Sequence, residues 1–134
     1  MSAQRRCLVW LPHSYTGRGP AESCVRSIEH FAASGLAPTL FVNRARKPVD
    51  ASIELVQALG GGPLNALPYR LVSKVAGRRL ERLFRRAVER AGPGSIAYFW
   101  PDAPTALVEH AKAHDLICVR EMINSPWAHA GPVL

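Results

Sequence analysis

His13 and Asp102 are the two side chains of this sequence whose types and positions best suit proton transfer. Each follows an apolar segment, His13 after residues 6–12 and Asp102 after residues 95–100. Imidazole has a pKa of about 6.5 in water, so His13 can act as a general base on a hydroxyl. Asp102 can orient that histidine or accept the proton itself. The alternatives are a solvated loop histidine and an aspartate that caps a helix near Pro104.

A glycine-containing loop follows the first apolar segment and predicts a ligand-binding turn. It reads HSYTGRGP over residues 13–20 and includes Gly17, Arg18 and Gly19. Glycines let a ligand approach the backbone closely, and the amides at the start of a helix favour an anion. The loop has neither the full G-x-G-x-x-G spacing nor the lysine of the phosphate-binding loop. It therefore predicts where a ligand binds but not which ligand.

Arg120, Glu121 and Asn124 lie at the end of the last apolar segment and in the loop that follows it. A charge buried without a partner is unfavourable, so Arg120 and Glu121 are expected to meet at the rim or to bind polar groups of a ligand. A structural ion pair with a neighbouring loop is the alternative. These three residues complete the candidate substrate-binding set.

His110 and His114 are four residues apart, which is a metal-ligand spacing on a helix. The segment HAKAH lacks the glutamate of the H-E-x-x-H motif and an evident third ligand. Leu107 and Ala111 are expected to define the buried face, which leaves both histidines near solvent. The sequence therefore predicts no metal and no other cofactor.

Length and composition predict one soluble domain. The chain has 134 residues, of which 48% are hydrophobic and 20% are charged, as in globular proteins. The apolar runs are far shorter than the roughly 18 residues of a membrane span, and the amino terminus has no signal-peptide core. Cys7, Cys24 and Cys118 form no C-x-x-C pair and are expected to be buried thiols. We therefore expect a cytoplasmic protein.

The net charge of +7 is concentrated in residues 70–90, which contain eight lysines and arginines against two glutamates. The simplest interpretation is a solvated helix face. The functional alternative is peripheral contact with an anionic membrane at its inner face, where each cation contributes about 1 kcal/mol. Nucleic acid is not expected as a partner, because no recognised motif or set of stacking aromatics accompanies the cations.

The elements that must position these residues alternate between strands and helices. Strands are expected at residues 6–12, 36–43, 95–100 and 116–121, and helices at residues 20–34, 69–91 and 104–114. Asp50 is expected to cap a short helix through Leu59, with a strand inside residues 53–59 as the alternative. Residues 64–67 suggest a brief edge strand. The buried stripe of the long helix is predicted to comprise Leu71, Val72, Val75, Leu80, Leu83, Phe84, Ala87 and Val88.

This alternation is typical of an α/β fold, here a three-layer Rossmann-like domain with a mainly parallel sheet. The carboxyl ends of parallel strands share one edge, so His13, Asp102 and Glu121 are expected to face one crevice. A helix pattern begins at Trp127, close to the last residue. We therefore expect residues 1–134 to be a single, truncated amino-terminal domain of a larger protein.

The segment VWLPHSYTGRGPAESCVRSIEHFAASGLAPTLFVN resembles the start of a GT-B-fold glycosyltransferase, with a strand, a glycine loop, a helix and a second strand. The segment SIAYFWPDAPTALVEHAKAHDLICVREMINSP resembles the later strand–helix–strand unit of that family, whose loops approach the acceptor. The resemblance implies an acceptor-side domain. The whole enzyme would transfer a sugar from a nucleotide-sugar donor to an acceptor hydroxyl.

The resemblance also implies roles for particular residues. Gly17 and Gly19 match the loop that approaches the sugar-nucleotide phosphates or the acceptor. Tyr98 and Trp100 stand where many members of the family carry histidines, so that contact is not matched. The family binds its donor mainly through a carboxyl-terminal domain, so residues 1–134 alone are expected to be inactive. The basic segment suggests an anionic or membrane-borne acceptor, such as a lipid-linked glycan.

A non-catalytic flavodoxin-like or receiver-like binding module is the alternative from a different class. A receiver needs an acidic cluster after its first strand, where this sequence has Pro12, His13 and Ser14. A flavin-binding loop would contain more hydroxyl side chains. Another roughly 150–250 residues of α/β pattern in the same reading frame would favour the transferase.

Overall fold

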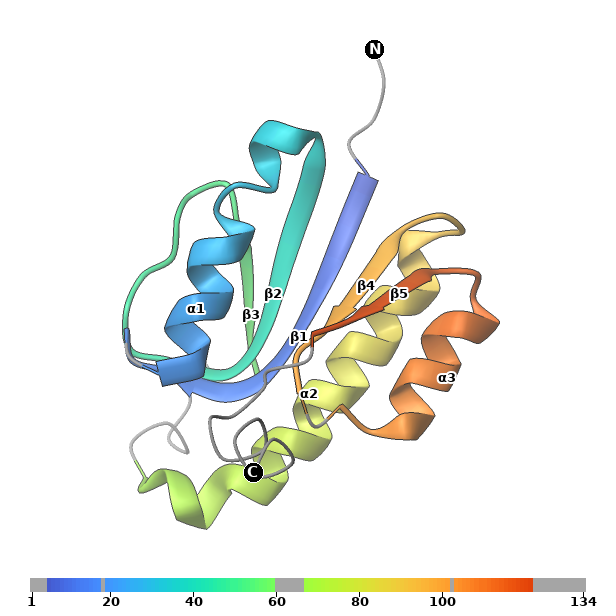
Figure 1. Cartoon of the computed structure of the whole chain (residues 1–134). Helices are drawn as coiled ribbons and strands as arrows, with labels where there is room; N and C mark the ends of the chain where they lie inside the picture. The colour runs from blue at the N-terminus through green and yellow to red at the C-terminus, as the bar shows by residue number, and fades with distance from the viewer. Residues whose placement is uncertain (1–4, 18, 60–66, 102, 122–134) are drawn as a thin grey trace, which may run out of the picture.

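A five-stranded parallel sheet between two helical layers forms the computed structural model of this chain (Figure 1). The structure describes residues 5–17, 19–59, 67–101 and 103–121. The strands are β1 (Arg5–Tyr15), β2 (Leu36–Ala45), β3 (Glu54–Gln57), β4 (Ile96–Phe99) and β5 (Ile117–Arg120). The helices are α1 (Gly19–Ile28), α2 (Tyr69–Ala91) and α3 (Thr105–Ala113), with a 3₁₀ turn, η1, at Ala32–Ser34. The predicted α/β Rossmann-like class is confirmed.

The strand order is β3-β2-β1-β4-β5, and every neighbouring pair is parallel. The chain builds the sheet outward from β1 to β3 and then returns to the other side of β1 to add β4 and β5. Trp10 at the centre of β1 is opposite Phe41 of β2 and Phe99 of β4. The direction of the strand order therefore reverses between β1 and β4, which is where open α/β sheets bind ligands.

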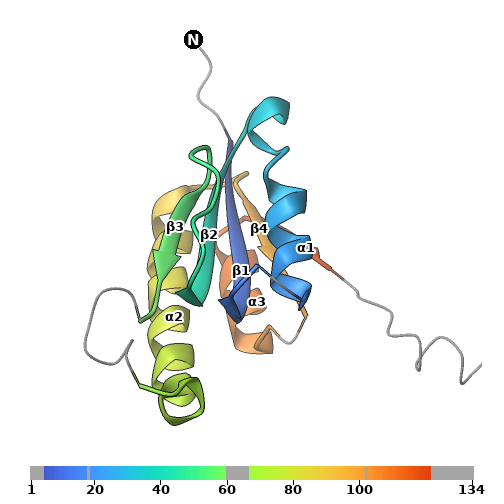
Figure 2. The same ribbon diagram turned by 90° about the vertical axis from the view of Figure 1, so that its left-hand side faces the viewer.

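The two faces of the sheet carry separate apolar cores because side chains alternate along each strand. Cys7, Val9 and Leu11 of β1 belong to the core on the α1 side, whereas Leu8 and Trp10 belong to the core on the α2 and α3 side. Figure 2 shows the sheet between these two layers. A central strand buried on both faces accounts for the continuous apolar run CLVWL.

Phe84 holds α2 over the centre of the sheet. Its ring centroid lies 5.4 Å from that of Trp10, 5.0 Å from that of Phe41 and 5.5 Å from that of Phe99. Edge-to-face and tilted aromatic pairs of this kind stabilise a core beyond the apolar area that they bury. The aromatic cluster therefore fixes where the basic helix crosses β1, β2 and β4.

The short helix expected over residues 50–59 is wrong, and the alternative strand in that segment is present as β3. Glu54–Gln57 pairs in parallel with residues 39–42 of β2, a tertiary contact that no local pattern reveals. The Asp50 carboxylate instead closes a turn, accepting hydrogen bonds from the backbone N–H and the hydroxyl of Ser52 at 2.9 and 2.6 Å. The strand suggested at residues 64–67 lies outside the described residues except for Leu67.

The long helix has the expected bounds, Tyr69–Ala91, but two of its predicted buried residues are exposed. Leu71 is 66% exposed and Val75 is 51% exposed. The stripe that faces the sheet repeats every four residues and comprises Val72, Ala76, Leu80, Phe84 and Val88. Leu83 and Ala87 have the same position relative to the stripe and are half-buried against the core. Leu71 and Val75 differ because they lie in the first part of α2, which extends past the ends of the strands (Figure 1).

Helix α1 is shorter than the sequence predicted, because it ends at Ile28 rather than at Ser34. The remaining residues form a turn and the short η1 segment before β2. Within the described part of the chain, no helix combines the length and apolar content needed to cross a bilayer.

Candidate functional site

The carboxyl ends of β1, β4 and β5 lie together at one edge of the sheet. The backbone N–H of Trp100 donates to the carbonyl oxygen of Trp10 at 3.0 Å, and that of Glu121 donates to Phe99 at 2.8 Å. His13, three residues beyond Trp10, and Glu121 therefore lie at the same edge of the sheet, as expected. Asp102 is outside the described residues, so its predicted role remains a prediction.

His13 lies inside the last part of β1 rather than in a loop. The pairing between β1 and β2 shifts register between Leu11 and Ser14, so Pro12 and His13 form an irregularity in the strand. Bulges of this kind redirect side chains next to functional sites. His13 is half-buried. Its predicted role as a general base is compatible with this position and remains a prediction.

The glycine loop has the backbone geometry that requires glycine at two positions. Gly17 has φ of +86° and Gly19 has φ of +72°, both in the left-handed region. A Cβ atom on Gly17 would lie 3.0 Å from Cδ of Lys47. The cationic side chain of Lys47 therefore packs against this loop, a contact that the sequence did not predict. Arg18 is outside the described residues.

Glu22, in the first turn of α1, accepts hydrogen bonds from Tyr15 before the glycine loop and from Arg26 after it. The Tyr15 hydroxyl donates to Oε2 of Glu22 at 3.3 Å, and Nε of Arg26 donates to Oε1 at 2.8 Å. The hydrogen bond from Arg26 is the main reason that the pKa of Glu22 is lowered. The backbone N–H of Arg46 also donates to the carbonyl oxygen of Tyr15 at 2.8 Å. These bonds hold the loop at the end of β1.

Glu121 is oriented by Tyr98, an aromatic residue of β4. The Tyr98 hydroxyl donates to Oε2 of Glu121 at 2.6 Å. Its ring lies between Phe31 and Trp100, with centroids 6.0 and 6.1 Å away. Burial, followed by the bond to Glu121, raises the pKa of Tyr98. The phenol therefore stays protonated at neutral pH and orients the carboxylate of Glu121.

Arg120 and Glu121 do not meet, in contrast to one of the expectations from sequence. Val119 lines a pocket with Tyr98 on the α1 side, whereas Cys118 packs against the core on the α3 side. The alternation along β5 therefore places Glu121 on the α1 side and Arg120 on the opposite side. The prediction that both bind a ligand remains a prediction, and Asn124 lies outside the described residues.

Three buried polar atoms have no hydrogen-bond partner among the described residues. They are Oγ of Ser14, Nε1 of Trp10 and Nε1 of Trp100. Leaving such an atom unpaired costs about 1–3 kcal/mol, so the two at the carboxyl ends of strands are candidate donors to a ligand. Ser14 and Trp100 lie at the carboxyl ends of β1 and β4, beside the reversal of strand order. The sequence did not indicate them, because a missing partner becomes visible only in three dimensions.

His110 and His114, the two histidines with metal-ligand spacing, have hydrogen-bond partners within the protein. His110 Nε2 lies 3.1 Å from Oε2 of Glu89, and His114 Nδ1 lies 3.0 Å from the carbonyl oxygen of His110. Cys7 and Cys24 are buried free thiols, as predicted, and Cys118 is half-buried. Over the described ranges, no group of three or more His, Cys, Asp or Glu residues is arranged to hold a metal ion.

No protein-family model, curated protein or solved structure matches this chain. The resemblance to GT-B glycosyltransferases is therefore a hypothesis. A function must be inferred from the geometry at the edge of the sheet where the carboxyl ends of the strands lie, which we call the carboxyl edge.

Proposed function

We propose that this chain is the acceptor-side domain of a glycosyltransferase that transfers a sugar from a nucleotide-sugar donor to an acceptor hydroxyl. The observation that carries the proposal is the reversal of strand order between β1 and β4, with the glycine loop directly at its edge. In open α/β sheets this position binds the ligand. The donor would contact this domain at the glycine loop and bind mainly to a separate carboxyl-terminal domain.

The strand order favours this proposal over the alternative binding module. Flavodoxin-like and receiver-like domains have the order 2-1-3-4-5, in which the third strand lies beside the first. Here β3 is at the edge, beyond β2, and β4 is beside β1. This is the order of dinucleotide-binding Rossmann domains, to which the proposed transferase domain is closer.

The polar groups at the carboxyl edge suit an acceptor rich in hydroxyl groups. The hydroxyl of Ser14 and the indole N–H of Trp100 are buried donors without partners among the described residues, and Glu121 is an acceptor oriented by Tyr98. In this proposal His13 removes the proton from the attacking hydroxyl, with Asp102 as its orienting or alternative base. Arg120 and Asn124 remain candidate contacts to the acceptor.

The basic helix favours an acceptor that is anionic or borne on a membrane, such as a lipid-linked glycan. Besides its cations, α2 exposes Leu71 and Val75, and Leu67 just before it is 43% exposed. Cations beside exposed apolar side chains are typical of a surface that lies on an anionic bilayer. We place the protein at the cytoplasmic face of the membrane in this proposal, in peripheral contact with it.

The test uses the whole product of the reading frame that contains these residues, screened for transfer or hydrolysis over a panel of nucleotide sugars. We expect one donor to be turned over when an acceptor is present, and no transfer by residues 1–134 alone. His13→Ala should lower kcat by about a hundredfold or more if His13 is the general base. Transfer by residues 1–134 alone, or turnover of no donor by the whole protein, would contradict the proposal.

A further inference from the structure

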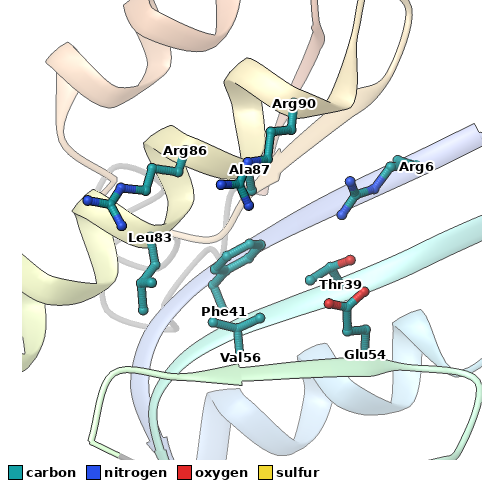
Figure 3. A pocket seen from close by; sticks show the side chains of 9 residues that line it. All are labelled: Arg6, Thr39, Phe41, Glu54, Val56, Leu83, Arg86, Ala87 and Arg90. Atoms are coloured by element: carbon teal, nitrogen blue, oxygen red, sulfur yellow. The ribbon is translucent and has the colours of Figure 1, made fainter.

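A groove of about 440 Å³ lies between the second half of α2 and the strands β1, β2 and β3 (Figure 3). It is open toward the amino ends of the strands, since Arg6 is the second residue of β1, Glu54 is the first of β3 and Arg90 is in the last turn of α2. The groove is therefore separate from the candidate site at the carboxyl edge, and an inference about it does not depend on the proposed function.

The groove exists because α2 does not cover the edge of the sheet. The helix packs against β1 and β2, and β3 lies beyond them at the edge. Of the four α2 residues that line the gap, Ala87 has the shortest side chain, and Thr39 is the smaller of the two lining residues of β2. The gap therefore follows from small side chains at the two positions where the helix and the sheet diverge.

The side chains of three arginines and one glutamate line the groove. Arg86 and Arg90 extend from α2, Arg6 from β1 and Glu54 from β3 (Figure 3). Among the described residues none of these four side chains forms a hydrogen bond or an ion pair, whereas Arg85 on the same helix pairs with Glu81 at 3.1 Å. Three cations against one anion leave an excess of two positive charges along the groove.

The floor of the groove is apolar. The ring of Phe41 is buried at its centre, and the half-buried side chains of Val56 and Leu83 lie beside it. Figure 3 shows the guanidinium groups of Arg6 and Arg90 on the side of the groove where the Phe41 ring lies. A ligand that fits must therefore carry an anionic group for the arginines and an apolar group for the floor.

We propose that this groove binds a small, soluble phosphate ester with an apolar or aromatic body. The planar guanidinium groups match phosphate oxygens with paired hydrogen bonds, which makes arginine the preferred residue for such anions. The volume lies within the range of pockets that bind small organic molecules. Glu54 can accept hydrogen bonds from hydroxyl groups on the body of the ligand, and the hydroxyl of Thr39 can donate or accept them.

The experiment titrates residues 1–134 with phenyl phosphate and follows the backbone amide signals by NMR. We expect saturable shifts at Thr39, Glu54 and Ala87. The double variant Arg86→Gln/Arg90→Gln should weaken binding by about tenfold or more, the loss typical of two charge-assisted hydrogen bonds. The matched control Arg78→Gln/Arg82→Gln removes the same charge from the same helix outside the groove, and it should bind nearly as tightly as the unchanged protein.

Several results would overturn the proposal. The groove would not be the site if phenyl phosphate gave no saturable shifts, or if the control variant lost as much affinity as the groove variant. Equal affinity for inorganic phosphate would exclude a role for the apolar floor. Binding to vesicles of anionic lipid, without binding of phenyl phosphate, would assign the arginines to a membrane rather than to a soluble ligand.

Discussion

The hydroxyl of Tyr98 lies 2.6 Å from Oε2 of Glu121, so the side chain of a buried β4 residue orients a carboxylate at the end of β5. Tyr98 is 8% exposed, and Glu121 is half-buried beside it. The bond therefore lies where the apolar core on the α1 side reaches the carboxyl edge of the sheet. It connects the stability of the fold to the geometry of the candidate site.

Tyr98→Phe should lower the free energy of unfolding by about 1–2 kcal/mol, because the charge-assisted bond is lost while the ring still packs. Urea unfolding at neutral pH measures the change. Tyr15→Phe is the matched control, since its bond to Glu22 is longer, at 3.3 Å, and Arg26 still satisfies that carboxylate. A Tyr98→Phe protein as stable as the original would show that the bond contributes nothing to folding.

Stability should fall at alkaline pH because of two buried thiols. Burial raises the pKa of Cys7 to about 11 and raises that of Cys24 further. Such thiols stabilise the fold fully below their unfolded pKa of about 8.5, and this contribution is lost as the pH rises toward the folded pKa. We expect each thiol to contribute a decrease of about 2 kcal/mol in the free energy of unfolding between about pH 8 and about pH 10, so about 4 kcal/mol in all.

The variant Cys7→Ala/Cys24→Ala tests whether those thiols are responsible. It should start from a lower stability because two core side chains become smaller, but its stability should change less over the same pH interval. Urea unfolding at each pH supplies both values. An unchanged slope in the variant would assign the alkaline loss to other groups.

Replacing Gly17 or Gly77 by alanine should change the stability of the protein in opposite directions. Gly17→Ala should destabilise the protein by about 1 kcal/mol, because its φ of +86° disfavours any side chain. Gly77 lies within α2 with no atom near its Cβ position, so Gly77→Ala should stabilise it by about 0.5–1 kcal/mol. Thermal unfolding of both variants measures the difference. Shortening Lys47 should not rescue Gly17→Ala, since the strain is in the backbone.

The exposed apolar residues of α2 should matter for membranes and not for stability. Leu71→Ser/Val75→Ser should change the free energy of unfolding by less than about 1 kcal/mol, because both side chains are largely in water. The same variant should bind more weakly to anionic vesicles in a sedimentation assay. Leu80→Ala, from the buried stripe, should instead cost about 2–5 kcal/mol. Vesicle binding that is absent, or unchanged in the double variant, would count against membrane contact.

The long helix and the parallel sheet could be predicted because their signals are local. The bounds Tyr69–Ala91 are marked by Pro68 before the helix and Gly92 after it, and the apolar runs of β1, β2 and β4 are continuous. Residues 50–59 were ambiguous, because only pairing with β2 decides between helix and strand. The exposure of Leu71 and Val75 depended on where α2 extends past the sheet, which the residue pattern alone does not show.

The candidate site was predictable in its location and not in its contacts. The carboxyl ends of parallel strands share one edge whatever the strand order, so His13 near the end of β1 and Glu121 after β5 were expected at the same edge. The bond between Tyr98 and Glu121, the position of Lys47 over Gly17 and the unpaired indole of Trp100 depend on register between distant segments. No local pattern in the sequence predicts that register.

The central position of β1 has a consequence for synthesis of the protein. One edge of β1 pairs with β2, which follows soon after it, but the other edge waits for Ile96–Phe99. At translation rates of about 5–20 residues per second, that edge stays open for several seconds after β1 has emerged from the ribosome. The nascent chain thus presents an unpaired, apolar strand to its surroundings, and it is during this interval that chaperones would be needed most.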